Sequence, residues 1–166
     1  MILWAHGLEG SPNGAKVTGL RAMGFEITAP DGRNLPLAGR IEGLLAESDR
    51  LAGQRPVLAG SSYGGLASAW LAAAHPERFR GVLLLAPALH YAEPPVTAAD
   101  ALRAPPGLPV HIIHGVGDPV VPVQASRDYI ARSAGAPATL EEVDDGHALV
   151  ASLPRVAAAL RTLLGA

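Results

Sequence analysis

Short apolar runs alternate with longer amphipathic stretches along the chain. The apolar runs do not alternate with polar positions, as Val82–Leu85 illustrates, and this is typical of strands buried on both faces. The predicted strands are Ile2–Ala5, Phe25–Thr28, Val57–Ala59, Gly81–Leu85, Val110–Ile113 and Thr139–Val143. The predicted helices are Gly14–Ala22, Leu37–Leu51, Gly65–Ala74, Val123–Ser133 and Ala148–Leu164. Helices that separate successive strands favour right-handed crossovers and an open parallel sheet.

One segment interrupts this alternation. Between Leu85 and Val110 the chain holds six prolines and one short helical pattern, Ala98–Arg103. Thr97 and Asp100 have the spacing of a capping box at the start of that helix. The segment is too short for a second domain, so we expect a small flap over the sheet edge and a single domain over residues 1–166.

Composition narrows the class of protein. The 166 residues are 49% hydrophobic with a net charge of -2, which indicates a folded globular domain without the basic stripe of a nucleic-acid-binding protein. Cysteine is absent. The first residues, Met1–Ala5, lack a basic start and read as a strand, not a signal peptide. No apolar run approaches the roughly 20 residues of a membrane span. We therefore expect a cytoplasmic protein with no membrane partner.

The pentad Gly60–Gly64, with the sequence Gly-Ser-Ser-Tyr-Gly, lies between a predicted strand and a predicted helix. A G-x-S-x-G pattern in this position forms a sharp turn that exposes a serine hydroxyl above a parallel sheet. Either serine could be the nucleophile. Small residues are needed two positions before and after it, because strand and helix pass close together there. Glycines flank Ser62 at those positions, whereas Ala59 and Tyr63 flank Ser61, so we predict Ser62.

A serine nucleophile needs an adjacent base. His147 is the best placed of the six histidines, because it follows the last predicted strand in a glycine-containing loop and can reach back over the sheet edge. His90, in the proline-rich segment, is the rival. The other four histidines read as loop-shaping residues, a helix cap or an outward-facing strand residue: His6, His114, His75 and His111.

The acid that orients the base should come from another strand end. Asp118 follows the fifth predicted strand and turns at the same sheet edge as the base. Asp145 is too close to His147 in sequence to reach its Nδ1 easily, and Asp144 and Glu93 remain alternatives. The chain order Ser62, Asp118, His147 is the order of α/β hydrolases.

Ester hydrolysis also needs donors for the negative charge on the carbonyl oxygen. We predict the backbone N–H of Tyr63, which follows the nucleophile at the helix N-terminus. The second predicted donor is the N–H of Leu8, in the loop after the first strand. Donors of this kind contribute about 3 kcal/mol each in the transition state.

With these residues in view, the chain resembles the α/β-hydrolase superfamily over nearly its whole length. The opening residues Ile2–Lys16 are similar to those of small, cap-less YqiA-like bacterial esterases, and Gly60–Gly65 and His114–Pro122 resemble the family's nucleophile and acid segments. The resemblance implies a three-layer αβα sandwich with six parallel strands in the order 2-1-3-4-5-6 and no cap domain. It also implies ester hydrolysis through Ser62, His147 and Asp118.

We therefore expect two-step acyl transfer on small or short-chain acyl esters, without a cofactor or a metal. A small-molecule ester is the expected partner. The predicted substrate contacts are His6, Gly7 and Leu89, in an open site lined also by Leu8, Tyr63 and Tyr91. Two alternatives remain: a thioesterase or peptidase that uses the same triad, and a non-catalytic ligand-binding protein that keeps the fold.

Overall fold

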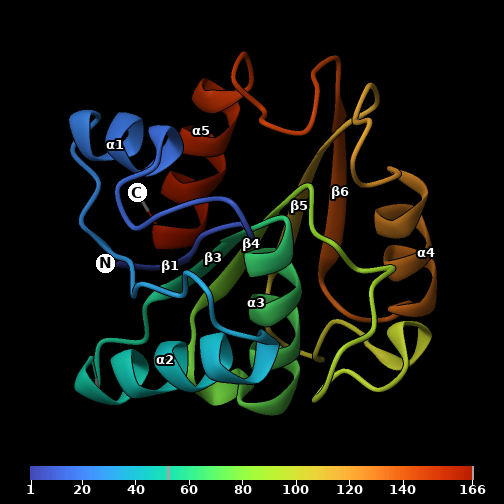
Figure 1. Cartoon of the computed structure of the whole chain (residues 1–166), viewed down its shortest axis with the longest axis horizontal. Helices are drawn as coiled ribbons and strands as arrows, with labels where there is room; N and C mark the ends of the chain where they lie inside the picture. Colours follow the sequence, from blue (N-terminus) through green and yellow to red (C-terminus); the bar gives the residue numbers. More distant parts are fainter. Residues whose placement is uncertain (52, 166) are drawn as a thin grey trace.

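Six parallel strands form one sheet in the order β2-β1-β3-β4-β5-β6, as predicted from the family resemblance (Figure 1). The computed structural model describes residues 1–51 and 53–165. The strands are β1 (Ile2–Ala5), β2 (Ile27–Thr28), β3 (Val57–Ser61), β4 (Gly81–Leu85), β5 (Val110–Gly115) and β6 (Ala138–Val143). Strands β1, β3 and β4 are buried along their whole length, which explains why their sequences are apolar except for Ser61 at the end of β3.

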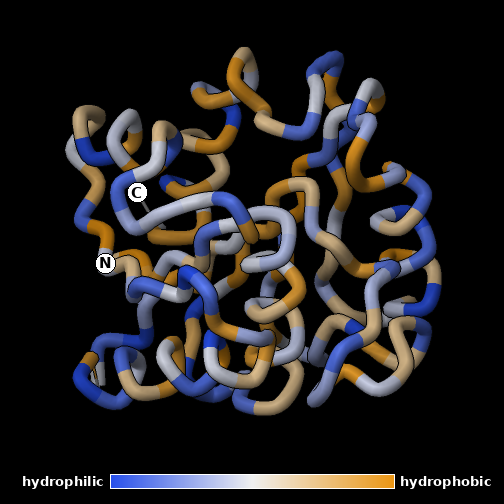
Figure 2. The backbone as a smooth tube through the Cα atoms, in the orientation of Figure 1, coloured by the Kyte–Doolittle hydropathy of each residue, from blue (hydrophilic) through white to orange (hydrophobic). Residues whose placement is uncertain are grey.

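Helices cover both faces of the sheet and complete the three layers. They are α1 (Ala15–Ala22), α2 (Leu37–Arg50), α3 (Tyr63–Ala74), α4 (Gln124–Arg132) and α5 (Leu153–Leu164), with 3-10 helices η1 (Pro76–Arg78) and η2 (Ala99–Ala101). Helices α1 and α5 pack on one face, and α2, α3 and α4 pack on the other (Figure 1). Figure 2 shows the apolar residues concentrated in the strands and on the inner sides of the helices. No helix within residues 1–51 and 53–165 has the length and apolar character to cross a membrane.

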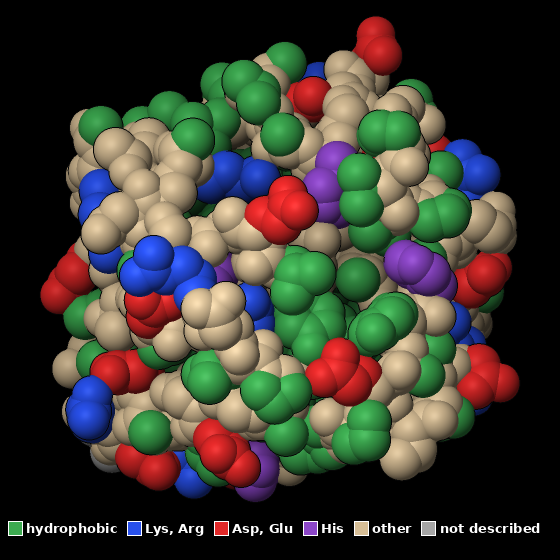
Figure 3. Space-filling view, viewed as in Figure 1, with side chains coloured by type: hydrophobic (Ala, Val, Ile, Leu, Met, Phe, Trp, Pro, Cys, Tyr) green, Lys and Arg blue, Asp and Glu red, His purple; other side chains and the backbone are tan. Residues whose placement is uncertain are grey.

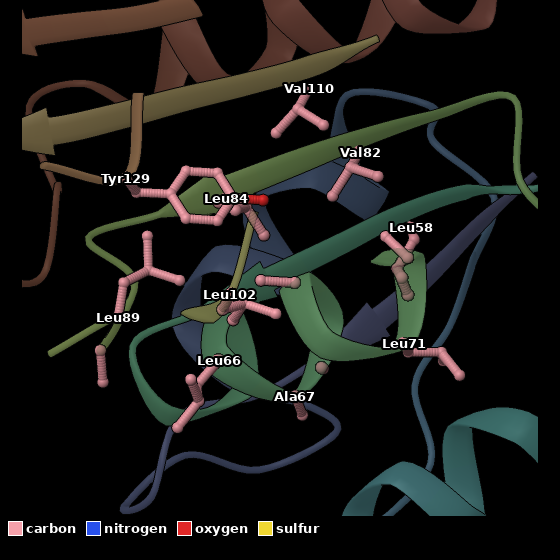
Figure 4. Close-up of a cluster of buried hydrophobic side chains, with 14 of the residues drawn as sticks. Leu58, Leu66, Ala67, Leu71, Val82, Leu84, Leu89, Leu102, Val110 and Tyr129 are labelled. Atoms are coloured by element: carbon pink, nitrogen blue, oxygen red, sulfur yellow. The ribbon is translucent and has the colours of Figure 1, made fainter. Parts of the chain in front are cut away.

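The larger apolar cluster packs α3 against the sheet (Figure 4), next to the turn that carries Ser62. Leu66 of α3 is fully buried, and so are Leu58 of β3 and Leu84 of β4. A fully buried leucine contributes about 1.5–3 kcal/mol relative to an exposed one. The first turn of α3 is therefore held rigidly, and with it the residues at the end of β3.

The strand ends that carry the predicted chemistry meet at one edge. Parallel strands place their carboxyl ends together, so the residues after β1, β3, β5 and β6 share this edge. Between β1 and β3 the strand order reverses, with β2 on one side and β3 on the other side of β1. In open α/β sheets, ligands bind outside the carboxyl ends of the strands at such a point.

The last helix is shorter than predicted. We expected it to begin at Ala148, but α5 begins at Leu153 with Pro154 in its first turn. Leu149 has a positive φ of 52°, which no helix tolerates. Proline fits a first helical turn because its missing N–H has no partner there in any case. Pro154 was thus the sequence signal for the true start.

Two smaller predictions also differ from the structure. Strand β2 has two residues instead of four, because Phe25 donates its amide to Leu20 O in the turn after α1. The capping box at Thr97 is wrong: η2 has Ala98 as its N-cap residue and no side-chain cap. The remaining helix and strand bounds agree with the prediction to within two residues.

Candidate active site

The turn between β3 and α3 holds Ser62, which is half-buried, in a strained backbone conformation. Ser62 has φ 56° and ψ -119°, a combination that costs a non-glycine residue about 1–3 kcal/mol. A Cβ added to Gly60 would collide with the backbone of Gly64. A Cβ added to Gly64 would collide with the carbonyl oxygens of Ala5 and His6. Both flanking glycines are therefore required by close backbone approach, in agreement with the choice of Ser62 over Ser61.

Backbone hydrogen bonds hold this turn to the neighbouring strand. The amide of Ser62 donates to Leu85 O at 2.9 Å, and the amide of Ala88 donates to Ser62 O at 3.0 Å. Both partners lie at or just beyond the end of β4. The strain at Ser62 is thus stabilised by bonds from outside its own turn.

Asp118 and His147 form a hydrogen-bonded pair at the same edge of the sheet. The Nδ1 atom of His147 lies 2.7 Å from Oδ2 of Asp118. Since an ionised carboxylate only accepts, Nδ1 carries the proton and Nε2 keeps a free lone pair. The side chain of Asp118 is fully buried, while that of His147 remains 25% exposed. An imidazole held in this tautomer can take a proton at Nε2.

Three donors converge on the Asp118 carboxylate. Its Oδ1 accepts the amides of Val120 and Val121, at 2.7 and 2.9 Å. Burial alone would raise the pKa of Asp118, but the hydrogen bonds from His147, Val121 and Val120 outweigh it and hold the pKa below its ordinary value. The carboxylate is therefore ionised and fixed in orientation at neutral pH.

Ser62 and His147 form no hydrogen bond within the described residues. Bonds between a nucleophile and its base are often long or poorly aligned in a free enzyme and tighten when substrate binds. The structure thus joins Asp118 and His147, the predicted acid and base, by a hydrogen bond, and it places Ser62 at the end of β3, separated from β5 by β4.

His114 supports the acid from inside the protein. It is fully buried, with Nε2 3.0 Å from Val121 O and Nδ1 2.7 Å from Ser126 Oγ of α4. A carbonyl only accepts, so Nε2 carries the proton, and it also lies 3.3 Å from Asp118 Oδ2. Burial lowers the pKa of His114, so the ring is neutral. The prediction of a loop-shaping histidine understated this contact.

The loop after β1 approaches Ser62 at Gly7, the residue before the second predicted oxyanion donor. A Cβ added to Gly7 would lie 3.5 Å from the Cβ of Ser62. The amides of Leu8 and Tyr63 make no loop or capping hydrogen bond in the described part of the chain. Both are therefore available to a ligand, as an oxyanion hole requires.

Arg40 of α2 holds this loop by its carbonyl groups. The guanidinium donates to His6 O at 2.8 Å, to Gly7 O at 3.3 Å and to Leu8 O at 3.4 Å. Arg40 is 5% exposed, so these bonds are formed away from water. With three successive carbonyls directed at one side chain, the orientation of the intervening peptide groups is restricted.

The same arginine reaches the residue after the nucleophile. Its Cζ lies 4.9 Å from the centre of the Tyr63 ring. The Tyr63 hydroxyl donates to Glu93 Oε2 at 2.6 Å, and Glu93 Oε1 accepts the amide of Leu37 at the start of α2. Burial and the bond to Glu93 raise the pKa of Tyr63. Glu93, an alternative acid in the sequence analysis, thus binds Tyr63 and α2.

The remaining candidates for the acid and the base lie elsewhere or bind other groups. Asp145 Oδ2 accepts both the amide and the hydroxyl of Ser152, at 2.9 Å each, and so anchors the turn before α5. Asp144 is exposed, and His90 is exposed on the segment after β4. Within residues 1–51 and 53–165, no three His, Asp or Glu side chains cluster as a metal ion would require.

The predicted substrate contacts differ in accessibility. His6 is buried, with Nδ1 2.8 Å from Gly7 O and Nε2 accepting the amide of Gly32. Leu89 is 1% exposed and packs in the larger core cluster (Figure 4). Leu8 and Tyr91 are exposed. On the face of the molecule drawn in Figure 3, apolar side chains gather near the middle, with histidines beside them.

The comparisons agree with this architecture. A structure described as a "putative hydrolase of the alpha/beta superfamily" from Xanthomonas campestris pv. campestris is 28% identical, with a TM-score of 0.77 over 99% of this chain and 97% of that one. Mouse alpha/beta hydrolase domain-containing protein 10 is 18% identical, with a TM-score of 0.81 over 99% and 89%. Est1E from Butyrivibrio proteoclasticus is 18% identical, with a TM-score of 0.80 over 98% and 86%. None of the curated protein sequences compared matches the chain.

The sheet order, the sharp turn between β3 and α3 and these relatives define the class. The protein is a hydrolase of the α/β-hydrolase fold. A family model described as "Putative esterase" matches residues 37–132, more than half of the chain. The chain belongs to this family. The matched range contains Ser62 and Asp118.

Proposed function

We propose that the protein hydrolyses carboxylic esters with small or short-chain acyl groups through an acyl-enzyme on Ser62. The observation that carries the proposal is the 2.7 Å bond between Asp118 and Nδ1 of His147, at the sheet edge where Ser62 leaves its strand. It leaves Nε2 of His147 as the base. Membership of an esterase family supports the same reaction class.

The reaction proceeds in two steps. Ser62 Oγ bonds to the carbonyl carbon as its proton passes to Nε2 of His147, and Asp118 stabilises the imidazolium. The carbonyl oxygen, now negative, binds the amides of Tyr63 and Leu8. The bond to the alcohol oxygen then breaks, and that oxygen takes the proton from His147. Water repeats the sequence on the acyl-enzyme and releases the acid.

The exposed surroundings of Ser62 favour small acyl groups. Leu8 is 63% exposed and Tyr91 is 48% exposed, so the lining residues on this face do not enclose a long chain. An acyl chain lying against these two residues would bury little apolar area beyond its first few carbons. We expect kcat/KM to be higher for p-nitrophenyl acetate and butyrate than for the decanoate and palmitate.

A panel of these esters, measured on three proteins, tests the proposal. Ser62→Ala should lose turnover and fluorophosphonate labelling, whereas Ser61→Ala, changed in the same pentad, should keep both. Residual wild-type activity in Ser62→Ala would remove this serine from the mechanism. Higher kcat/KM on matched acyl thioesters than on oxyesters would replace the ester by a thioester as substrate.

A further inference from the structure

A pocket of about 230 Å³ opens beside the nucleophile turn, on the face of the sheet covered by α1 and α5. Gly7 and Ser61 are among its lining residues, and so are residues 148–150, which follow His147. Because Gly7 approaches Ser62 closely, the pocket begins next to the predicted nucleophile. Most of its wall is apolar: Trp4, Val17, Leu149, Val150 and Leu153.

Lys16 is the one lining residue of this pocket that carries a permanent charge. It is also the only lysine of the 166 residues. Within the described part of the chain its ammonium group forms no hydrogen bond and no ion pair within 4.0 Å. Burial lowers the pKa of Lys16, and the charge of Asp145 opposes that effect only in part.

Asp145 does not neutralise Lys16 by contact. Its carboxylate accepts Gly146 N on one oxygen and both donors of Ser152 on the other. A partly buried ammonium group without a bonded counterion loses hydration that nothing in the protein replaces. An anion that entered the pocket would replace it, and the attraction would be stronger there than between charges in water.

We propose that Lys16 binds a carboxylate of the substrate, so that the protein prefers esters that carry a second, ionised carboxyl group. The inference rests on the hydrolase function proposed above and names its substrate class. Such a molecule would place its ester group at Ser62, a short apolar stem against Leu149 and Val17, and its anionic end at Lys16, since these last three residues line the same pocket. Apolar walls with few placed polar groups are typical of small-molecule sites.

The carboxylate could belong to the acid or to the alcohol portion of the ester. Two matched pairs of substrates separate these sources. Mono-p-nitrophenyl glutarate and p-nitrophenyl pentanoate differ by a charge on the acyl side. Acetoxybenzoate and acetoxybenzamide, both para-substituted, differ by a charge on the leaving group. For each pair we take the ratio of kcat/KM for the anionic ester to kcat/KM for the neutral ester. This ratio is compared between wild type and variant, so that the intrinsic reactivity of the two esters cancels.

Lys16→Met should lower this ratio at least tenfold for one of the pairs, through a loss of kcat/KM on the anionic ester. Lys16→Arg should keep most of the preference. Arg50→Met is the matched control, because it removes one positive charge from an exposed position on α2 and should leave both ratios unchanged. Ratios unchanged in Lys16→Met for both pairs would overturn the proposal while the ester hydrolase function stands.

A binding measurement separates this inference from the proposed function. In protein labelled with ¹³C-lysine, the side chain of Lys16 gives a single set of resonances. Monomethyl glutarate added to the Ser62→Ala protein should shift them saturably, whereas methyl pentanoate should not. If wild type hydrolyses no ester, the proposed function fails and this titration still decides whether Lys16 binds carboxylates. para-Acetoxybenzoate, titrated in the same way, tests a carboxylate on the alcohol side, and no saturable shift with either compound would overturn the inference.

Discussion

The guanidinium of Arg40 lies 4.9 Å above the ring of Tyr63 and bonds the carbonyls of the loop that faces it. One buried side chain therefore contacts both peptide segments that supply the predicted oxyanion donors. Tyr63 carries one donor in its own amide, and Leu8 carries the other. The distance between the two donors depends on a residue that touches neither reacting atom.

Arg40→Met is expected to lower kcat about 10- to 100-fold with little change in KM, because misplaced donors weaken only the transition state. Arg40→Lys should restore only part of this loss. A lysine keeps the positive charge, but its ammonium group lacks the planar fork of donors with which the guanidinium reaches three carbonyls. Steady-state kinetics on a short p-nitrophenyl ester measure both, with thermal unfolding curves to show that the variants are folded. An unchanged kcat in folded Arg40→Met would contradict the positioning role.

Asp118→Asn should lower kcat by about 10⁴, because an amide directs an N–H at His147 and forces the proton onto Nε2. Asp144→Asn, an equivalent change at the exposed neighbour of Asp145, should leave kcat within twofold. Steady-state kinetics near pH 7 compare the two variants, and ¹⁵N spectra of the imidazole report the tautomer. Equal losses in both variants would assign the effect to the loop as a whole.

The backbone strain at Ser62 predicts an unusual order of stabilities. Glycine adopts φ 56° and ψ -119° without steric cost, so Ser62→Gly should be more stable than Ser62→Ala by about 1–2 kcal/mol. In thermal unfolding this corresponds to about 2–4 °C per kcal/mol for a chain of this size. At Thr18, exposed within α1, the order should reverse, because glycine weakens a helix. If alanine were the more stable replacement at both positions, the backbone at Ser62 would be unstrained.

Gly64→Ala is expected to destabilise the protein by several kcal/mol and to abolish activity, since the new methyl group would meet the carbonyls at the end of β1. Inside a helix, replacing glycine by alanine normally raises stability, so a second helical glycine with free space around it is the control. A Cβ at Gly43 of α2 would meet only Pro30, at 4.0 Å, and Gly43→Ala should raise stability by up to about 1 kcal/mol. Chemical denaturation of the two variants measures the difference. A Gly64→Ala protein as stable as wild type would disprove the close approach.

His114 makes the stability sensitive to acid. Burial lowers the pKa of His114 in the folded protein, whereas the unfolded chain has the ordinary value near 6.5. Below about pH 6.5 the unfolded chain binds a proton that the folded protein does not, so the free energy of unfolding falls as pH decreases, by up to about 1.4 kcal/mol per pH unit. His114→Asn should show a smaller decline between pH 7 and pH 5 in urea unfolding.

The exposed histidine provides the comparison for this slope. His90→Asn makes the same chemical change on the surface and should keep the wild-type decline between pH 7 and pH 5. If wild type and His114→Asn lose stability in parallel over this range, another group is responsible for the acid sensitivity.

The sheet could be predicted because the central strands are mostly apolar, and the strand ends locate Ser62, Asp118 and His147 before any contact is known. The start of α5 could not be predicted from propensity. Residues 148–152 suit a helix in composition, but the Asp145 carboxylate binds the backbone of Ser152 and holds the chain in turns. The proline at 154 was the only local sign.

The supporting residues were less accessible to sequence reasoning. Arg40 falls on the buried stripe of α2 with Leu37, Ile41 and Leu44, and a charged residue at such a position signals a buried partner. The partners themselves are carbonyl groups some 30 residues away, which no spacing rule identifies. Glu93 likewise meets Tyr63 only through the path of the proline-rich segment across the sheet edge.

The polar contacts from Ser126 through His114 to Asp118 have a consequence for variation in the α4 layer. The hydroxyl of Ser126, which is fully buried, orients the ring of His114, and that ring contacts the carboxylate of Asp118. Replacement of Ser126 by alanine would conserve the packing of the helix and yet release the ring. A chain that differs only at this interior position can therefore keep Ser62, Asp118 and His147 and still hold the Asp118 carboxylate less firmly.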